Sequence, residues 1–162
     1  MKKMPFGGSR RRERSVEIAT NGVPAPGGLA RMARFCEKSL REAGFSGWNV
    51  SILLCSDERI TALNHRYRRR REATDVLSFP EEDGRTGEPV AGDIAISLDA
   101  LRRNAAEFDV PENDEMKRLL VHGLLHLAGM NHGRGTGGVM LALQERLLDT
   151  LQSEKVFRET RK

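Results

Sequence analysis

A chain of 162 residues is long enough to form one domain that buries about two-thirds of its unfolded surface without cross-links. Its two cysteines, Cys36 and Cys55, lie far apart in apolar surroundings, which excludes a disulfide-stapled scaffold and predicts buried free thiols. No apolar run approaches the roughly 20 residues of a membrane span, and the N-terminus lacks the apolar region of a secretory signal, so we expect a soluble, cytoplasmic protein.

The net charge of +4 is concentrated in two basic patches. Residues 1–14 carry six basic side chains and one acidic one, and residues 66–71 contain five arginines, whereas the rest of the chain is mildly acidic. Such clustering is typical of proteins that bind a phosphate backbone. Two alternatives need no ligand. Residues 1–14 could form a solvated tail, and part of the arginine cluster could complement the C-terminal end of a helix dipole.

Composition divides the chain into three parts. Residues 1–14 lack apolar periodicity and are expected to form a flexible basic arm. Residues 15–155 are expected to form a single domain, followed by a polar tail at 156–162.

The spacing of apolar residues and the turn residues between them predict nine elements. In chain order we expect a strand at 15–20, a helix at 29–43, a strand at 48–55, a helix from Ser56 or Asp57 to about Tyr67, strands at 75–80 and 92–97, and helices at 99–109, 112–129 and 137–152. The strand at 48–55 is apolar enough to be central. This order predicts an α+β (mixed α/β) fold in which a sheet of about four strands is covered by about five helices.

Three of the four histidines lie in the predicted helix at 112–129 and just beyond it, in the pattern H-x3-H-x5-H. His122 and His126 are one helical turn apart on one face, which is the separation needed to bind a single ion. Gly129 is placed to end the helix in a left-handed conformation, after which the chain can return His132 as a third ligand. Three nitrogen ligands leave a fourth tetrahedral position for water, as in catalytic zinc sites.

The rest of this helix restricts the chemistry. Glu115 and Arg118 share the face of the histidines while the other faces are apolar, so a buried helix presents one polar stripe, which must face a cleft, a metal or a hydrogen-bond network. Gly123 occupies the place where zinc proteases carry a glutamate base, which argues against peptide hydrolysis. A helical glycine also indicates a close approach, either by a backbone or substrate or by a tight contact with the sheet.

Four short motifs follow one another between about residues 50 and 150. They are Leu63-Asn64 with Tyr67-Arg68, Thr74-Asp75-Val76-Leu77-Ser78-Phe79-Pro80, Gly92-Asp93-Ile94 with Ile96-Ser97, and His122-Gly123-x-Leu125-His126-Leu127-x-Gly129 with His132. Together these motifs closely resemble those of the YbeY family of bacterial metal-dependent endoribonucleases.

The resemblance implies a zinc-dependent hydrolase that cuts single-stranded RNA, matures the 3′ end of small-subunit ribosomal RNA and takes part in ribosome quality control. It implies one zinc ion on His122, His126 and His132, and a catalytic role for Arg68 in neutralising the scissile phosphate. The implied partners are ribosomal RNA and the small subunit, without a nucleotide cofactor or a membrane. Asn131 departs from the family, which usually has aspartate before the third histidine, and an amide would not raise the basicity of a histidine as a carboxylate does.

Some alternatives stay open at this point. The protein could be a non-catalytic ribosome assembly factor with a structural zinc, or a metallohydrolase acting on peptides or small esters, which would need a carboxylate such as Glu115 beside the metal. Thr74 and Asp75 could orient Arg68, and Asp93 could pair with a histidine, although both aspartates could simply cap or form turns. The other arginines of 66–71 are expected to attract the RNA backbone without specificity, and such binding weakens steeply with salt.

Overall fold

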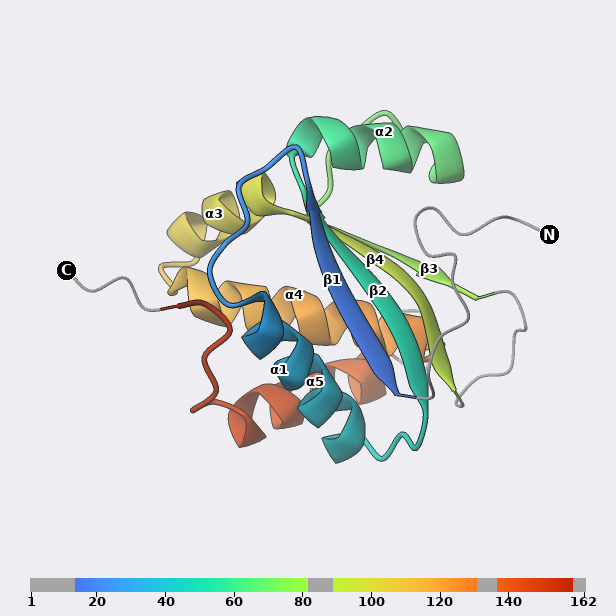
Figure 1. Ribbon diagram of the computed structural model, residues 1–162, viewed down its shortest axis with the longest axis vertical. Helices are drawn as coiled ribbons and strands as arrows, with labels where there is room; N and C mark the ends of the chain where they lie inside the picture. Colours follow the sequence, from blue (N-terminus) through green and yellow to red (C-terminus); the bar gives the residue numbers. More distant parts are fainter. Residues whose placement is uncertain (1–13, 82–88, 131–136, 159–162) are drawn as a thin grey trace.

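The computed structural model describes residues 14–81, 89–130 and 137–158, and its centre is a four-stranded sheet (Figure 1). The strands are β1 (Ser15–Asn21), β2 (Trp48–Cys55), β3 (Val76–Pro80) and β4 (Val90–Ser97). Their spatial order is β1-β2-β4-β3, with β1, β2 and β4 parallel and β3 antiparallel to β4. The predicted central position of β2 is confirmed, and β3 forms an edge of the sheet.

Five helices cover the sheet, as predicted for this mixed α/β fold. They are α1 (Leu29–Glu42), α2 (Asp57–Arg68), α3 (Leu98–Glu107), α4 (Glu112–Leu127) and α5 (Gly137–Thr150). The main core joins one face of the sheet to α1, α4 and α5. A smaller core lies on the other face, where Ile60 and Leu63 of α2 pack on Leu53, Cys55, Leu77 and Ala95. The sheet is therefore buried on both sides, which explains why β2 and β4 are mostly apolar and do not alternate with polar residues.

Helix α4 runs through the main core and is buried on nearly every side, as its sequence predicted. It ends in a Schellman motif, in which the Gly129 N–H donates to His126 O at 3.0 Å and the Met130 N–H donates to Leu125 O at 3.0 Å. Gly129 has a φ of 86°, so the left-handed end expected from the sequence is confirmed.

The close approach expected at Gly123 is a helix–sheet contact. A Cβ atom at this position would lie 3.1 Å from two methyl carbons of Ile94 and 3.4 Å from a methyl carbon of Val76. The sheet therefore approaches α4 between the two histidines, and the glycine allows the strands and the helix to pack closely.

The three-part division of the chain stays a prediction, since most of the arm at 1–14 and half of the tail lie outside the described residues. Val156 is fully buried, and its N–H donates to Asn113 Oδ1 at 2.8 Å, so the packed region continues past residue 155. Among the described helices, none is long and apolar enough to cross a membrane.

The start of α2 is tied to α3 by an ion pair. Asp57 accepts hydrogen bonds from Arg103 at 2.6 and 3.2 Å and from Ser97 Oγ at 2.7 Å. The bond from Arg103 is the main cause that holds the pKa of Asp57 below its ordinary value of 3.8.

A lowered folded pKa makes the contribution of Asp57 to stability depend on pH. This contribution is complete well above the unfolded pKa and is lost as the pH falls below 3.8 through the lower folded pKa. We expect Asp57→Asn to destabilise the protein more at about pH 6 than at about pH 2, measured by urea unfolding. A destabilisation that is equal at both pH values would contradict this assignment.

Candidate active site

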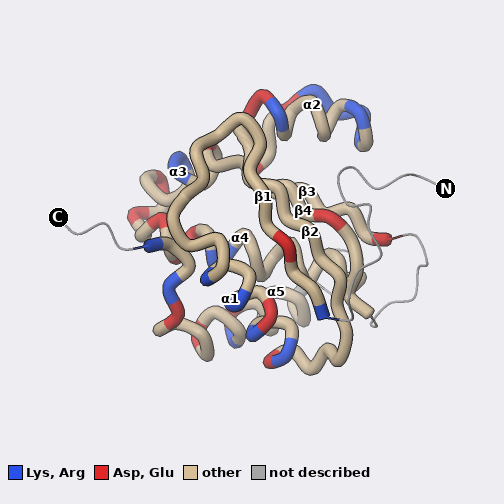
Figure 2. Tube along the Cα trace, viewed as in Figure 1, with Lys and Arg blue, Asp and Glu red and all other residues tan. Residues whose placement is uncertain are grey.

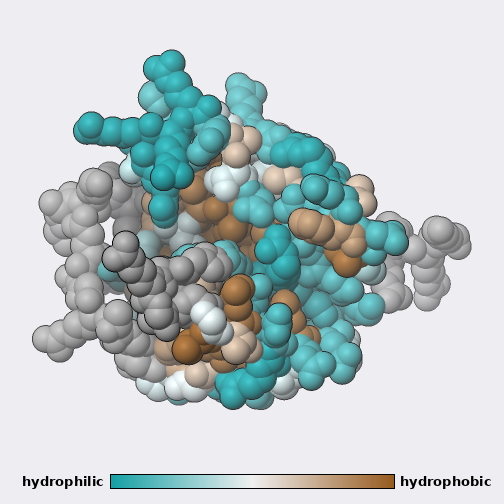
Figure 3. Space-filling view, turned by 180° about the vertical axis from the view of Figure 1, so that it is seen from behind, coloured by the Kyte–Doolittle hydropathy of each residue, from teal (hydrophilic) through white to brown (hydrophobic). Residues whose placement is uncertain are grey.

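A cavity of about 1000 Å³ lies between the end of α2, the free edge of β3 and the C-terminal turns of α4. Its lining includes Asn64, Arg68, Arg70, Glu72, Thr74, Asp75, Val76, Leu77, Ser78, Pro80, His122, His126, Gly129 and Met130. Figure 3 shows this side of the molecule, where hydrophilic side chains overhang an apolar surface. Three of the four residues predicted to form the site, Arg68, His122 and His126, are thus brought to one cavity.

The two histidines on α4 point toward each other. Their Nε2 atoms lie 3.0 Å apart, and their ring centroids are 4.5 Å apart with an angle of 74° between the planes. Two nitrogens on one tetrahedral zinc at about 2.0–2.1 Å would be separated by about 3.3 Å. The described pair therefore fits a shared metal ion with a shift of only a few tenths of an ångström.

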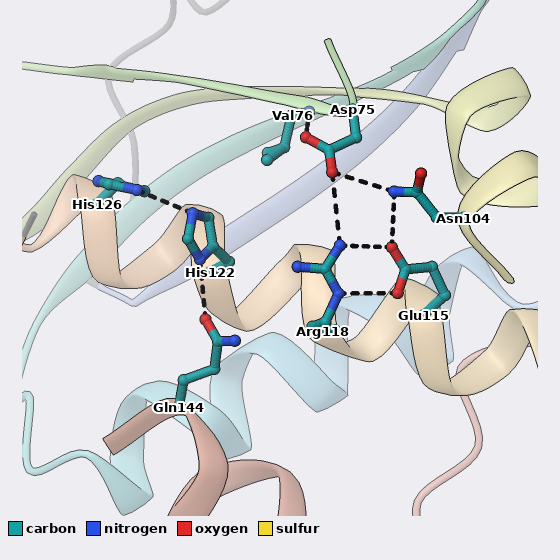
Figure 4. Close-up of polar contacts among 8 residues, drawn as sticks. All are labelled: Asp75, Val76, Asn104, Glu115, Arg118, His122, His126 and Gln144. Atoms are coloured by element: carbon teal, nitrogen blue, oxygen red, sulfur yellow. Dashed lines mark hydrogen bonds and ion pairs between the residues drawn. The ribbon is translucent and has the colours of Figure 1, made fainter. Parts of the chain in front are cut away.

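The other nitrogen of His122 has a partner on a different helix. Its Nδ1 lies 2.9 Å from Oε1 of Gln144, which projects from α5 and is only 7% exposed (Figure 4). An amide oxygen can only accept, so Nδ1 carries the proton and the lone pair of the neutral ring is on Nε2, which faces His126. This second partner selects the tautomer that a metal ligand requires.

His132 lies outside the described residues, and so does Asn131. Its role as a third ligand stays a prediction, which rests on the sequence spacing and on the family resemblance. The Schellman motif at Gly129 is compatible with this role because it turns the chain sharply after the second histidine.

Arg68 reaches the cavity from the last turn of α2. Its Nη2 donates to the carbonyl oxygen of Ser78 at 2.7 Å, and its guanidinium carbon lies 5.8 Å from the centre of the Phe79 ring. The backbones of residues 75 and 81 form hydrogen bonds with the chain of β4. Bonded and non-bonded residues alternate along an antiparallel strand, so the carbonyl group of Ser78 faces away from β4, out of the sheet edge and toward α2. Among described residues, this hydrogen bond uses one of the five N–H donors of Arg68, so most of the guanidinium can face a ligand.

Ser78 also connects this arginine to the helix that carries the histidines. Its hydroxyl donates to the carbonyl oxygen of Gly123 at 3.0 Å, and the side chain is buried. One residue of β3 therefore holds Arg68 through its backbone and α4 through its side chain, which fixes the distance between the two halves of the site.

The polar residues earlier on α4 form a separate network. Arg118 donates to both carboxylate oxygens of Glu115 at 2.8 and 2.6 Å and to Asp75 at 3.5 Å, and Asn104 donates to both acids (Figure 4). The bond to Glu115 is the main cause of the raised pKa of Arg118. Of the two roles left open for Asp75, the structure shows the local one, since its Oδ1 accepts from the Val76 N–H at 2.8 Å, and its other oxygen contacts Arg118 rather than Arg68. The start of β3 is thereby tied to α4.

Glu115 does not occupy the position that a metalloprotease base would need. Its side chain is 2% exposed, lies about two helical turns before His122 and is bonded to Arg118 and Asn104. Glu115 therefore cannot serve as the carboxylate base that a peptide or ester hydrolase requires beside the metal.

The basic residues at and just after the end of α2 are exposed, and two of them, Arg68 and Arg70, line the cavity. Arg66, Arg68, Arg69, Arg70 and Arg71 all have exposed side chains. Figure 2 shows positive charge gathered along this end of α2. A positively charged rim beside two candidate metal ligands suits a polyanionic substrate.

Known proteins resemble this chain over most of its length. The family model described as Endoribonuclease YbeY matches residues 28–152. The chain belongs to the YbeY endoribonuclease family. The YbeY endoribonuclease of Treponema denticola is 41% identical over 152 residues, which cover 89% of this chain and 97% of that protein. The YbeY endoribonuclease of Aquifex aeolicus is 36% identical over 105 residues, 65% of this chain and 70% of that protein.

The solution structure of TM1509 from Thermotoga maritima has the same fold. Its TM-score is 0.57 at 24% sequence identity, and the match covers 86% of this chain and 93% of that one. The α/β architecture inferred from the order of the elements is therefore found in a solved structure.

Sequence reasoning missed two residues of the site. Gln144 could have been noticed, because a polar residue on the apolar face of α5, one turn from Met140 and near Leu147, needs a buried partner. Ser78 lies in one of the four motifs, but nothing in the sequence around it indicates the contacts that it makes with Arg68 and Gly123.

Proposed function

We propose that this protein is a metal-dependent endoribonuclease that hydrolyses phosphodiester bonds in single-stranded RNA. The observation that carries the proposal is that Arg68 and the His122–His126 pair line one cavity, although they are more than 50 residues apart in sequence. Membership of the YbeY family supports the same activity, because the relatives are named as endoribonucleases.

The proposed cofactor is one zinc ion held by His122, His126 and His132. When bound, zinc supplies a Lewis acid that activates water and polarises a phosphate oxygen. Gln144 holds the tautomer of His122 that can ligate. Arg68, steadied by Ser78, donates to the phosphate oxygens and stabilises the negative charge that grows on them in the transition state.

The proposed biological substrate is ribosomal RNA of the small subunit, whose 3′ end would be matured in the cytoplasm, with a further part in ribosome quality control. These finer assignments rest on the family resemblance. The exposed arginines of 66–71 support an RNA partner, since they would attract the phosphate backbone without reading its sequence.

Cleavage of a single-stranded oligoribonucleotide tests the activity. Zinc-loaded protein is expected to cut it, chelated protein to lose the activity, and Arg68→Ala to cut about 10²- to 10³-fold more slowly, as for loss of one donor to a developing charge. Arg59→Ala is the matched control, because Arg59 is an exposed residue near the start of the same helix and outside the cavity lining.

Two outcomes would reject the proposal. Full activity after chelation would exclude metal-dependent hydrolysis. Tight zinc binding without RNA cleavage by the wild-type protein would instead favour a ribosome assembly factor with a structural zinc.

A further inference from the structure

Two arginine side chains and two aromatic rings contact one another in a row that begins beside the cavity and ends at Arg68, which lines it. The Arg66 guanidinium carbon lies 5.4 Å from the centre of the Tyr67 ring. The Tyr67 and Phe79 rings are 5.3 Å apart at an interplanar angle of 66°. The guanidinium carbon of Arg68 lies 5.8 Å from the Phe79 ring, so the series runs from Arg66 to the cavity.

The two ends of this series differ in what they face. Arg68 lines the cavity, and so do Ser78 and Pro80, which flank Phe79 in β3. Arg66 is exposed and lies outside the cavity lining, and Tyr67 and Phe79 are both partly exposed. A strand whose phosphate is held at Arg68 would therefore meet flat, partly open surfaces as it leaves the cavity.

The chemistry of these surfaces suits an unpaired base. Aromatic rings and guanidinium planes both stack on nucleobases, and this stacking is tolerant of sequence because every base has a flat face. A base inside a duplex is already stacked on both sides and cannot lie on such a surface. The remaining arginines, Arg69, Arg70 and Arg71, have no ring beside them in the part of the chain that the structure describes, and their charge suits the RNA backbone.

We propose that Arg66, Tyr67 and Phe79 form a base-stacking subsite that binds one unpaired nucleotide next to the phosphate held by Arg68. This subsite rests on the proposed function and deepens it, because it supplies a physical reason for a preference for single strands. The rings also cover the small core beneath α2, so a test must separate stacking from packing.

The test uses the full-length protein, treated with a chelator so that the RNA stays intact, and single-stranded oligoribonucleotides that carry one 2-aminopurine. Stacking on the subsite is expected to change the fluorescence of 2-aminopurine in a single strand, whichever position it occupies, and to leave the fluorescence of a duplex that carries it unchanged. Tyr67→Leu keeps an apolar cover over the core and is expected to remove this change and to weaken binding about tenfold. Tyr67→Phe keeps the ring and is expected to retain both. Thermal unfolding of each variant reports any loss of packing.

Salt dependence separates stacking from charge. Tyr67→Leu is expected to lower affinity equally at low and high salt, since no phosphate contact is lost, whereas Arg70→Ala should reduce the dependence of log Kd on log salt. Arg66→Lys keeps the charge and loses the plane, so it is expected to weaken stacking with an unchanged salt slope.

Retention of wild-type fluorescence change and affinity by both Tyr67→Leu and Phe79→Leu would overturn the subsite. If RNA binds with the predicted stacking but zinc-loaded protein does not cut it, the subsite stands and the proposed nuclease activity fails. If zinc-loaded protein cuts RNA and the Leu variants are unaffected, the activity stands and the subsite fails.

Discussion

Gly92→Ala is expected to destabilise the protein by about 3 kcal/mol or more, because the position has no room for a side chain and its backbone disfavours one. Gly92 lies in β4 with a φ of 149°. An added Cβ would collide with the carbonyl oxygen of Phe79 in the neighbouring strand and lie 2.8 Å from a methyl carbon of Leu127. The carbonyl belongs to the β3–β4 pairing and cannot move without breaking the edge of the sheet that holds Arg68. Urea unfolding measures the loss.

Gly123→Ala is the matched control for this prediction. The nearest atoms to its added Cβ are methyl carbons of Ile94 and Val76 at 3.1 to 3.4 Å, and these side chains can shift by the few tenths of an ångström required. Alanine is favoured over glycine inside a helix by about 0.5–1 kcal/mol, which offsets the crowding. We therefore expect a change within about 1 kcal/mol, and an equal loss for Gly92→Ala and Gly123→Ala would show that backbone collision is not the determining cause.

The secondary structure could be predicted because its signals are local. Ser56 accepts a hydrogen bond from the Arg59 N–H at 3.3 Å, as expected of a helix cap, and Gly129 ends α4 at the predicted residue. The spacing of His122 and His126 also gave their shared face correctly, since that follows from helix geometry alone.

The contacts of the site residues and the order of the strands could not be predicted in the same way. They depend on segments that are distant in sequence, which local periodicity does not encode. Asp75 could have oriented Arg68 or capped its own turn, and in the structure it accepts from the Val76 N–H and meets Arg118, because β3 packs against α4. The orienting contact of Arg68 is instead a backbone carbonyl, which any residue at position 78 would provide. The strand order that places β3 at the edge, and so opens the cavity, is likewise set by packing rather than by the sequence of β3.

His126→Ala is expected to abolish tight zinc binding, and Gln144→Leu to weaken it about 10- to 100-fold, although Gln144 would never touch the ion. The physical reason is that the amide oxygen holds the proton on Nδ1 of His122 and so keeps the lone pair of Nε2 directed at His126. In Gln144→Leu the imidazole ring of His122 can rotate or adopt the other tautomer. Zinc then binds only the fraction of molecules in which Nε2 carries the lone pair and faces His126, which lowers the affinity. Competition with a chromophoric chelator measures the affinity without any reference to RNA cleavage.

Gln144→Glu and Glu145→Gln complete this experiment. Glutamate at position 144 keeps an acceptor for Nδ1 and adds the charge that raises the basicity of the imidazole, so zinc affinity should be at least that of the wild-type protein. Glu145 is the exposed neighbour of Gln144 on α5, and its replacement should leave the affinity unchanged. If Gln144→Leu bound zinc as tightly as the wild-type protein while remaining folded, the orientation of His122 would have to be set by side-chain packing rather than by the hydrogen bond that it donates to Gln144.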